Sequence, residues 1–90
     1  MYVIDYLDKA VKDLTKLQKS EPNAYKKASK LIEELKQNPK TGTGHPEQLK
    51  GNRNNQWSRR ITDKHRLVYE IRDTHVIVIV ISAYGHYDDK

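Results

Sequence analysis

Two side chains of this 90-residue chain have the chemistry that proton transfer requires. His86 stands four residues from the C-terminus, and histidine is the side chain whose unperturbed pKa places it between its two forms near neutral pH. Glu47 stands among cations, which favour a carboxylate; this suits a structural salt bridge and equally a base that must be ionised before it acts. Taken alone, Glu47 is most simply a salt-bridge partner and His86 a solvated surface group.

Positive charge is concentrated in the part of the chain that contains Glu47. The formal net charge is +5, and between Lys40 and Arg66 there are seven basic and two acidic residues, whereas the remainder of the chain is balanced. This distribution is typical of a polyanion-binding surface, with nucleic acid as the first candidate and an acidic protein segment as the second. A set of merely solvated lysines and arginines is the alternative.

Length and composition exclude several classes of protein. Ninety residues predict one domain, 1–90, with a single core. The absence of cysteine removes disulfides and thiolate chemistry and fits a reducing, cytoplasmic setting. No apolar run approaches a membrane span, and the first 20 residues are charged throughout, so no membrane partner is predicted. The four histidines (His45, His65, His75 and His86) match no short metal motif, so no metal or other cofactor is predicted.

The elements that must position these residues follow from apolar spacing. Tyr2–Ile4 has the character of a short strand. Two stretches then show helical periodicity, with apolar side chains at Leu7, Ala10, Val11, Leu14 and Leu17 and at Tyr25, Ala28, Leu31, Ile32 and Leu35. After a Gly- and Pro-containing loop, short strands are expected over residues 47–50, 56–62, 66–72 and 76–83, the last apolar on both faces and therefore central. The sequence predicts an α+β domain: a two-helix hairpin packed on one face of a small, mostly antiparallel sheet of four to five strands.

Alternation along the strands assigns side chains to the two faces of the sheet. The odd-numbered apolar residues, such as Trp57 and Leu67, are predicted to point toward the helices, which places Arg60 and Arg66 together on the opposite face. Arg59 and His65 have core-side parity. Because both lie near strand ends, we expect their side chains to reach solvent.

The C-terminal residues are expected close to these arginines. A central strand ends in the middle of the sheet, so the residues after Ala83 emerge beside the strands that carry Arg60 and Arg66. Tyr84 and Tyr87 offer aromatic rings on which bases stack for about 1–3 kcal/mol each, or they cover the end of the core. By its parity with Leu49, Glu47 is expected on the core side.

Three motifs carry a resemblance to a known family. HPEQLK (residues 45–50), WSRRITDKHRLVYEI (residues 57–71) and GHY (residues 85–87) together resemble the YoeB/Txe toxins of the RelE superfamily, the toxin halves of bacterial type II toxin–antitoxin modules. The resemblance covers nearly the whole chain in element order and length. It implies a RelE-like fold and a ribosome-dependent messenger-RNA endonuclease that cuts in the ribosomal A site, without a cofactor, and inhibits translation.

The resemblance also implies roles for individual residues. Glu47 corresponds to the general base, His86 to the general acid, Arg66 to the phosphate-stabilising arginine and Tyr87 to the terminal tyrosine. Further RNA- or phosphate-binding positions are Lys50, Arg59, Arg60 and Lys64. Tyr84 remains a stacking candidate on its aromatic character alone, since some relatives carry a basic-aromatic pair where this chain has Tyr84-Gly85. Whereas familiar members end at His-Tyr, this chain continues with Asp88-Asp89-Lys90.

The implied partners are the ribosome, messenger RNA and a YefM-type antitoxin with an acidic, disordered C-terminal segment. Operator DNA is implied only through the antitoxin complex, and family members also occur as homodimers. The competing hypothesis is a basic module without catalysis that grips RNA or an acidic protein through the same face.

Overall fold

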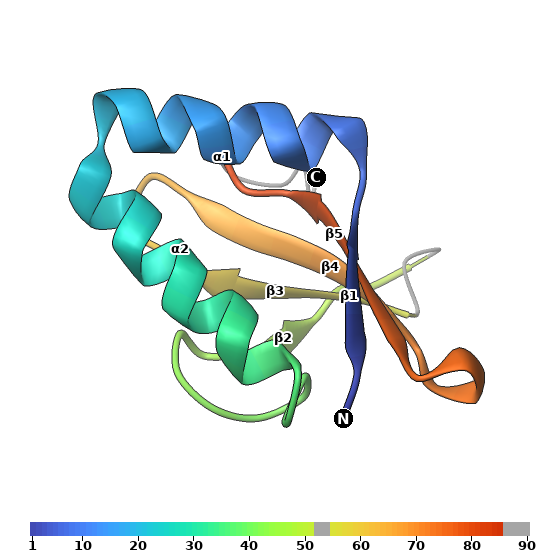
Figure 1. Cartoon of the computed structure of the whole chain (residues 1–90). Coiled ribbons are helices and arrows are strands. Elements are labelled where there is room, and N and C mark those ends of the chain that lie inside the picture. Colours follow the sequence, from blue (N-terminus) through green and yellow to red (C-terminus); the bar gives the residue numbers. More distant parts are fainter. Residues whose placement is uncertain (52–54, 86–90) are drawn as a thin grey trace.

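The computed structural model describes residues 1–51 and 55–85 and consists of two helices and five strands within these ranges (Figure 1). In chain order the elements are β1 (Val3–Tyr6), α1 (Asp8–Ser20), α2 (Pro22–Leu35), β2 (Glu47–Gln48), β3 (Gln56–Arg60), β4 (Arg66–Arg72), a 3-10 turn (Asp73–His75) and β5 (Ile77–Ser82). The predicted order of elements is confirmed, with differences at the strand ends.

The predicted strand over 56–62 is two residues too long. The chain turns directly after β3, where the N–H groups of Ile61 and Thr62 both donate to the His65 carbonyl, at 3.0 and 3.2 Å. The Thr62 hydroxyl then accepts the N–H groups of Lys64 and His65, at 3.1 and 3.2 Å. A threonine side chain that bonds to nearby backbone competes with the strand ladder, so β3 ends at Arg60.

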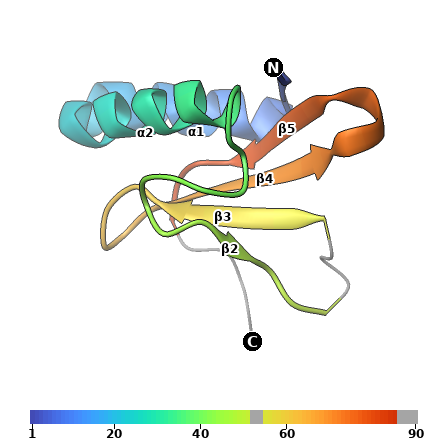
Figure 2. The same ribbon diagram turned by 90° about the horizontal axis from the view of Figure 1, so that it is seen from below.

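The five strands form one sheet in the order β1-β5-β4-β3-β2. β1 pairs with β5 in parallel, and the remaining neighbours are antiparallel. β5 lies between β1 and β4, so the last strand is an interior strand, but the central strand of the five is β4 and not β5 as predicted. Both helices lie on the same side of the sheet (Figure 2), so the predicted α+β architecture is confirmed and the sheet has one face without helices. We call this surface the helix-free face.

The core fills the space between the helical hairpin and the sheet. α1 contributes Ala10 and Leu17, α2 contributes residues such as Leu31 and Leu35, and β4 contributes Leu67, Tyr69 and Ile71, all of them buried. The odd-numbered residues of β4 therefore point toward the helices, as the alternation predicts. Burial of each large aliphatic side chain contributes about 1.5–3 kcal/mol.

β5 contains an irregularity that no local sequence signal marks. Val68 is opposite Ser82, but Tyr69 is opposite Val80, so Ile81 has no directly opposed residue on β4. An extra residue of this kind exchanges the two faces for everything that follows it. Val80 points into the core, yet Ser82 shares the face of Val68 and it is Ala83 that is fully buried next. The shift sets the direction in which the chain leaves the sheet.

Candidate active site on the helix-free face

Strand register places Glu47 on the helix-free face. Glu47 is opposite Ser58, Ser58 is opposite Val68, and Val68 is opposite Ser82; directly opposed residues share a face. The Glu47 side chain is exposed and, among residues 1–51 and 55–85, forms no ion pair. The expectation that Glu47 lies on the core side is wrong.

The parity with Leu49 misled that expectation. Leu49 is buried, but it does not belong to the core cluster under the helices. Its N–H donates to the Gln56 carbonyl at 2.9 Å, which continues the β2–β3 pairing by one residue. Leu49 is therefore buried on the helix-free side of the sheet. Its apolar character predicted burial correctly but did not predict on which face of the sheet Leu49 and Glu47 lie.

The two arginines predicted to share this face do so. Arg60 and Arg66 are directly opposite each other on β3 and β4. Arg60 is exposed and Arg66 half-buried, with one guanidinium N–H donated to the Thr62 carbonyl at 3.0 Å. Arg60 is also the diagonal neighbour of Glu47 across β2–β3, and such neighbours lie about 7–8 Å apart, within reach of long side chains. A carboxylate and two guanidinium groups therefore gather over three adjacent strands.

The remaining predicted positions divide into two sets. Lys50, just after β2, and Lys64, in the turn between β3 and β4, are both exposed, so their predicted contacts with RNA stay predictions. His86 and Tyr87, together with the Asp88-Asp89-Lys90 extension, lie outside the described residues. The predicted general acid therefore has no described position, and only the approach to it, up to Gly85, is defined.

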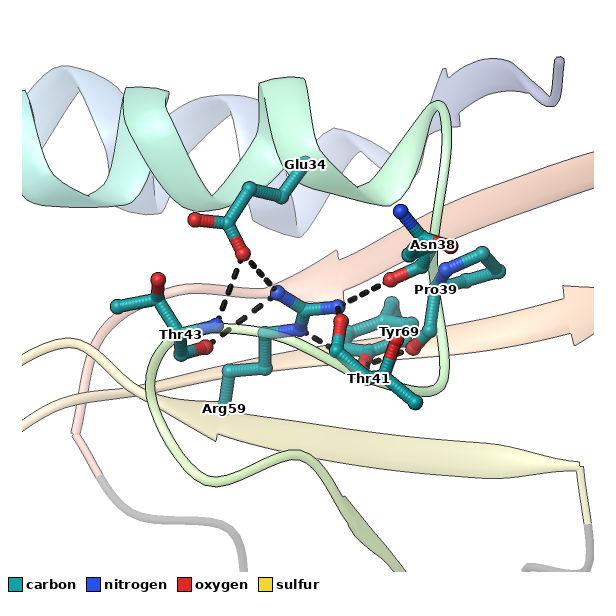
Figure 3. Close-up of polar contacts among 7 residues, drawn as sticks. All are labelled: Glu34, Asn38, Pro39, Thr41, Thr43, Arg59 and Tyr69. Carbon is teal, nitrogen blue, oxygen red and sulfur yellow. Dashed lines mark hydrogen bonds and ion pairs between the residues drawn. The ribbon is translucent and has the colours of Figure 1, made fainter.

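Arg59 does not reach solvent, and its predicted contact with RNA is corrected by the structure. The side chain is completely buried on the helix side of the sheet. Its donors meet acceptors within the protein (Figure 3): the Tyr69 hydroxyl at 3.2 Å, Glu34 Oε1 at 2.8 Å, and the carbonyl oxygens of Thr43 at 3.3 Å, Thr41 at 2.7 Å and Asn38. The physical reason is that the loop after α2 brings backbone carbonyls that satisfy a buried guanidinium.

The Arg59 cluster holds the loop that leads from α2 to β2. Glu34 accepts the Thr43 N–H at 2.9 Å as well as Arg59, and these bonds, that of Thr43 first, hold the pKa of Glu34 below its ordinary value. The Tyr69 hydroxyl donates to the Pro39 carbonyl at 2.7 Å, and burial raises the pKa of Tyr69. By fixing this loop, Arg59 supports the placement of Glu47 from the opposite side of the sheet.

His65 is also buried, with 3% of its surface exposed, so the expectation that it reaches solvent is wrong. Tyr84 packs against the core, with its ring centroid 4.4 Å from that of His65 and 4.1 Å from Lys16 Nζ. This placement fits the alternative role considered for Tyr84, covering the end of the core, while the stacking of bases on the half-buried ring stays a prediction. Core-side parity was the signal that identified both Arg59 and His65 as buried, and proximity to strand ends was the wrong reason to set it aside.

The described part of the chain contains no group of three or more His, Asp or Glu side chains arranged to hold a metal ion. Within the same residues, neither helix has the length and apolar character needed to cross a bilayer. His45 and His75 are exposed, while both ring nitrogens of His65 are engaged by protein groups. The chemistry available on the described part of the helix-free face is that of carboxylates, Glu47 and the Arg72-bound Glu70, and of cationic side chains.

A helical hairpin over one face of a five-stranded sheet is the fold shared with solved structures of the YoeB class of toxins. The model of the YoeB-like toxins of bacterial type II toxin–antitoxin systems matches residues 6–87, and the chain belongs to this family. Toxin YoeB of Escherichia coli strain K12 is 41% identical over 61 residues, which are 68% of this chain and 73% of that protein.

Two solved structures from Staphylococcus aureus show the same fold. A heterotetrameric complex of the YoeB-YefM toxin-antitoxin has a TM-score of 0.81 at 32% identity and covers 97% of this chain and 99% of that one. A YoeB dimer has a TM-score of 0.83 at 33% identity, covering 96% and 98%.

Proposed function

We propose that this toxin is a ribosome-dependent endoribonuclease that cleaves messenger RNA in the ribosomal A site and thereby inhibits translation. The observation that supports the proposal best is the register across β2, β3 and β4, which gathers Glu47, Arg60 and Arg66 on the helix-free face. Membership of the YoeB family supports it independently of that geometry.

The proposed reaction needs no metal. Glu47, as general base, removes the proton from the RNA 2′-hydroxyl, and the 2′-oxygen forms a bond to the adjacent phosphorus. The bond from phosphorus to the 5′-oxygen breaks, and His86, as general acid, protonates that oxygen. The products are a 2′,3′-cyclic phosphate and a 5′-hydroxyl. Arg66, with Arg60 and Lys50, stabilises the negative charge that gathers on the phosphoryl oxygens in the transition state.

The proposed partners are the ribosome, messenger RNA and an acidic antitoxin. The Staphylococcus aureus relative forms a YoeB-YefM complex, and the exposed cations on the helix-free face are suited to an acidic segment that folds on binding. Binding of operator DNA would then depend on the antitoxin. A homodimer is proposed from the dimer of the Staphylococcus aureus relative, and a cytoplasmic location from the need to reach ribosomes.

The test of catalysis compares matched amide variants on programmed ribosomes. Glu47→Gln and His86→Gln should each reduce the cleavage rate about 10²–10⁴-fold, because each removes one proton-transfer group, with unchanged thermal unfolding. Glu70→Gln is the control for the carboxylate, because Glu70 has the same strand-face parity but is bound by Arg72 at 2.7 Å. His75→Gln is the control for the histidine, because His75 lies at the other end of β4 from Arg66.

The same assay separates the enzyme from the non-catalytic binding module. A module that only grips RNA or an acidic protein keeps its effect on translation in Glu47→Gln and His86→Gln and loses affinity in Arg60→Gln. If both amide variants cut at the wild-type rate, the catalytic proposal is refuted. Comparing translated with naked messenger RNA tests the ribosome dependence, since only the translated message should be cut.

A further inference from the structure

The segment Ala83–Gly85, which leads directly into His86, is held at every residue by groups from other elements. The Ala83 N–H donates to Asp13 Oδ2 of α1 at 3.0 Å. The Tyr84 ring lies beside Lys16 of α1 and His65, as described above. Gly85 has a positive φ of 76°, a conformation that suits glycine. Side chains of α1 and His65, and not strand pairing alone, therefore hold residues 83–85 in place.

Gly85 is bound on both sides of its backbone. Its N–H donates to His65 Nδ1 at 2.8 Å, and its carbonyl oxygen accepts the N–H of Arg66 at 2.9 Å. The two partners are consecutive residues, so the start of β4 provides both contacts. One of them is the backbone of Arg66, whose side chain is proposed to stabilise the phosphate. The peptide that precedes the proposed acid is thus tied to the proposed phosphate-binding residue.

The hydrogen-bond partners of His65 define the tautomer of its ring. Because Nδ1 accepts the Gly85 N–H, that nitrogen carries no proton, and the ring proton of the neutral imidazole sits on Nε2. Nε2 lies 2.8 Å from Glu21 Oε2 at the start of α2 and donates to it. His65 is 3% exposed, so solvent does not compete for either nitrogen. Glu21 orients the ring and selects the tautomer that can accept from Gly85.

We infer that His65 is a positioning residue for the cleavage reaction, which acts by holding the Gly85 peptide from which His86 follows. The inference rests on the proposed function, because holding the Gly85 peptide affects the cleavage rate only if His86 is the general acid. A displacement of about 1 Å of a catalytic group can reduce a rate about 100-fold. The hydrogen bond from Gly85 to His65 therefore matters more for the rate than for the fold.

The competing explanation is that His65 is only structural and ties the β3–β4 turn to α2 through Glu21. Two amide substitutions separate the two roles. Asparagine places its side-chain oxygen close to the position of Nδ1 and keeps an acceptor for the Gly85 N–H, but it does not reach Glu21. Glutamine extends its amide nitrogen toward the position of Nε2 and keeps the donor to Glu21, but it lacks the acceptor for Gly85.

The experiment measures single-turnover cleavage on programmed ribosomes for wild type, His65→Asn, His65→Gln and His86→Gln, together with thermal unfolding of each. If His65 positions the acid, His65→Gln is slower by about 10–100-fold, whereas His65→Asn stays within about threefold of wild type. A structural role through Glu21 predicts the reverse order, with His65→Asn the more damaged variant in both rate and stability. That reverse order overturns the inference.

A second measurement does not depend on nuclease activity. Amide hydrogen exchange at Gly85 should be faster by roughly 3–10-fold in His65→Gln than in wild type, and close to wild type in His65→Asn, because only the glutamine variant lacks the acceptor. Wild-type cleavage by His65→Gln, alongside inactive His86→Gln, overturns the inference and leaves the proposed function standing. Wild-type cleavage by His86→Gln instead refutes the assignment of the general acid itself.

Discussion

Replacing the buried Arg59 by methionine tests whether the loop before β2 is held as described. Methionine keeps an unbranched apolar stem but removes every donor of Arg59. Three backbone carbonyls, the Glu34 carboxylate and the Tyr69 hydroxyl then each lose one hydrogen bond, and Glu34 keeps the bond from the Thr43 N–H. Breaking a buried ion pair by removing one partner costs about 3–5 kcal/mol. Because the Glu34 side chain is 37% exposed and can be rehydrated, we expect a value near the lower limit, about 3 kcal/mol.

This loss is large relative to the stability of a small domain, which is typically about 5–15 kcal/mol. For a domain of this size, each kcal/mol corresponds to about 4–8 °C in the melting temperature, so Arg59→Met should melt roughly 12–24 °C below wild type. The assay is thermal and urea unfolding at neutral pH, followed by circular dichroism. The melting temperature of Arg59→Lys should lie between those of wild type and Arg59→Met, since lysine keeps the charge but offers three donors from one point.

Arg60→Met is the matched control, because Arg60 is the next residue of β3 and is exposed. Substitutions at such surface positions usually change stability by less than about 0.5 kcal/mol. The account of the buried cluster is refuted if Arg59→Met is within about 1 kcal/mol of wild type, or if Arg60→Met destabilises the domain as much.

Two further predictions concern the same loop and the C-terminal approach. The folded-state pKa of Glu34 lies below its ordinary value of 4.5, so its stabilisation is present above that pH and is lost as the pH falls through the folded pKa. The difference in unfolding free energy between wild type and Glu34→Gln should therefore shrink between about pH 5 and pH 3 in urea titrations. Gly85→Ala should cost about 1–2 kcal/mol through its positive φ and should also slow cleavage. Gly51→Ala, with a φ of 74°, should cost about the same stability and slow cleavage less, because Gly51 adjoins Lys50, only one of three proposed charge-stabilising cations, whereas Gly85 adjoins the proposed general acid.

A different result would contradict each of these two predictions. A wild-type advantage over Glu34→Gln that stays constant or grows toward acidic pH would show that the carboxylate form is not favoured by folding. Among residues 1–51 and 55–85, no atom lies within 4 Å of a Cβ added at Gly85 or at Gly51, so with respect to these residues the two alanine variants differ in location and not in crowding. Equal cleavage rates for both variants would contradict a role for the Gly85 backbone in the reaction.

Local patterns in the chain predicted most of the architecture. Apolar spacing located both helices, and the alternation in Arg66–Arg72 predicted the face of every core residue on β4, because a strand buried on one side must alternate. The apolar stretch around Val78 and Val80 predicted an interior strand. The same alternation placed Arg60 and Arg66 together. Strand ends were less predictable, since a side-chain hydrogen bond such as that of Thr62 decides where pairing stops.

The sequence predicted which residue types form the candidate site, but not every position that they take in the fold. The sequence motifs identified Glu47, Arg60 and Arg66 as candidates, and the strand register brings these three to one face. Arg59 and His65 were misjudged because their positions near strand ends were given more weight than their inward parity. A buried cation such as Arg59 is stable only when acceptors surround it. Its acceptors come largely from the loop after α2, and the sequence of β3 does not predict the conformation of that loop.

By itself, therefore, the sequence determined the elements, their order, the inward and outward faces of regular strands and the family of the protein, because these depend on residues near one another in the chain. Only the tertiary structure decided how strands are paired. The register of β2 against β3 moved Glu47 to the helix-free face, and the extra residue Ile81 reversed the faces at the end of β5. It also decided that His65 meets Gly85, 20 residues away, because a contact between distant residues depends on packing that no local pattern encodes.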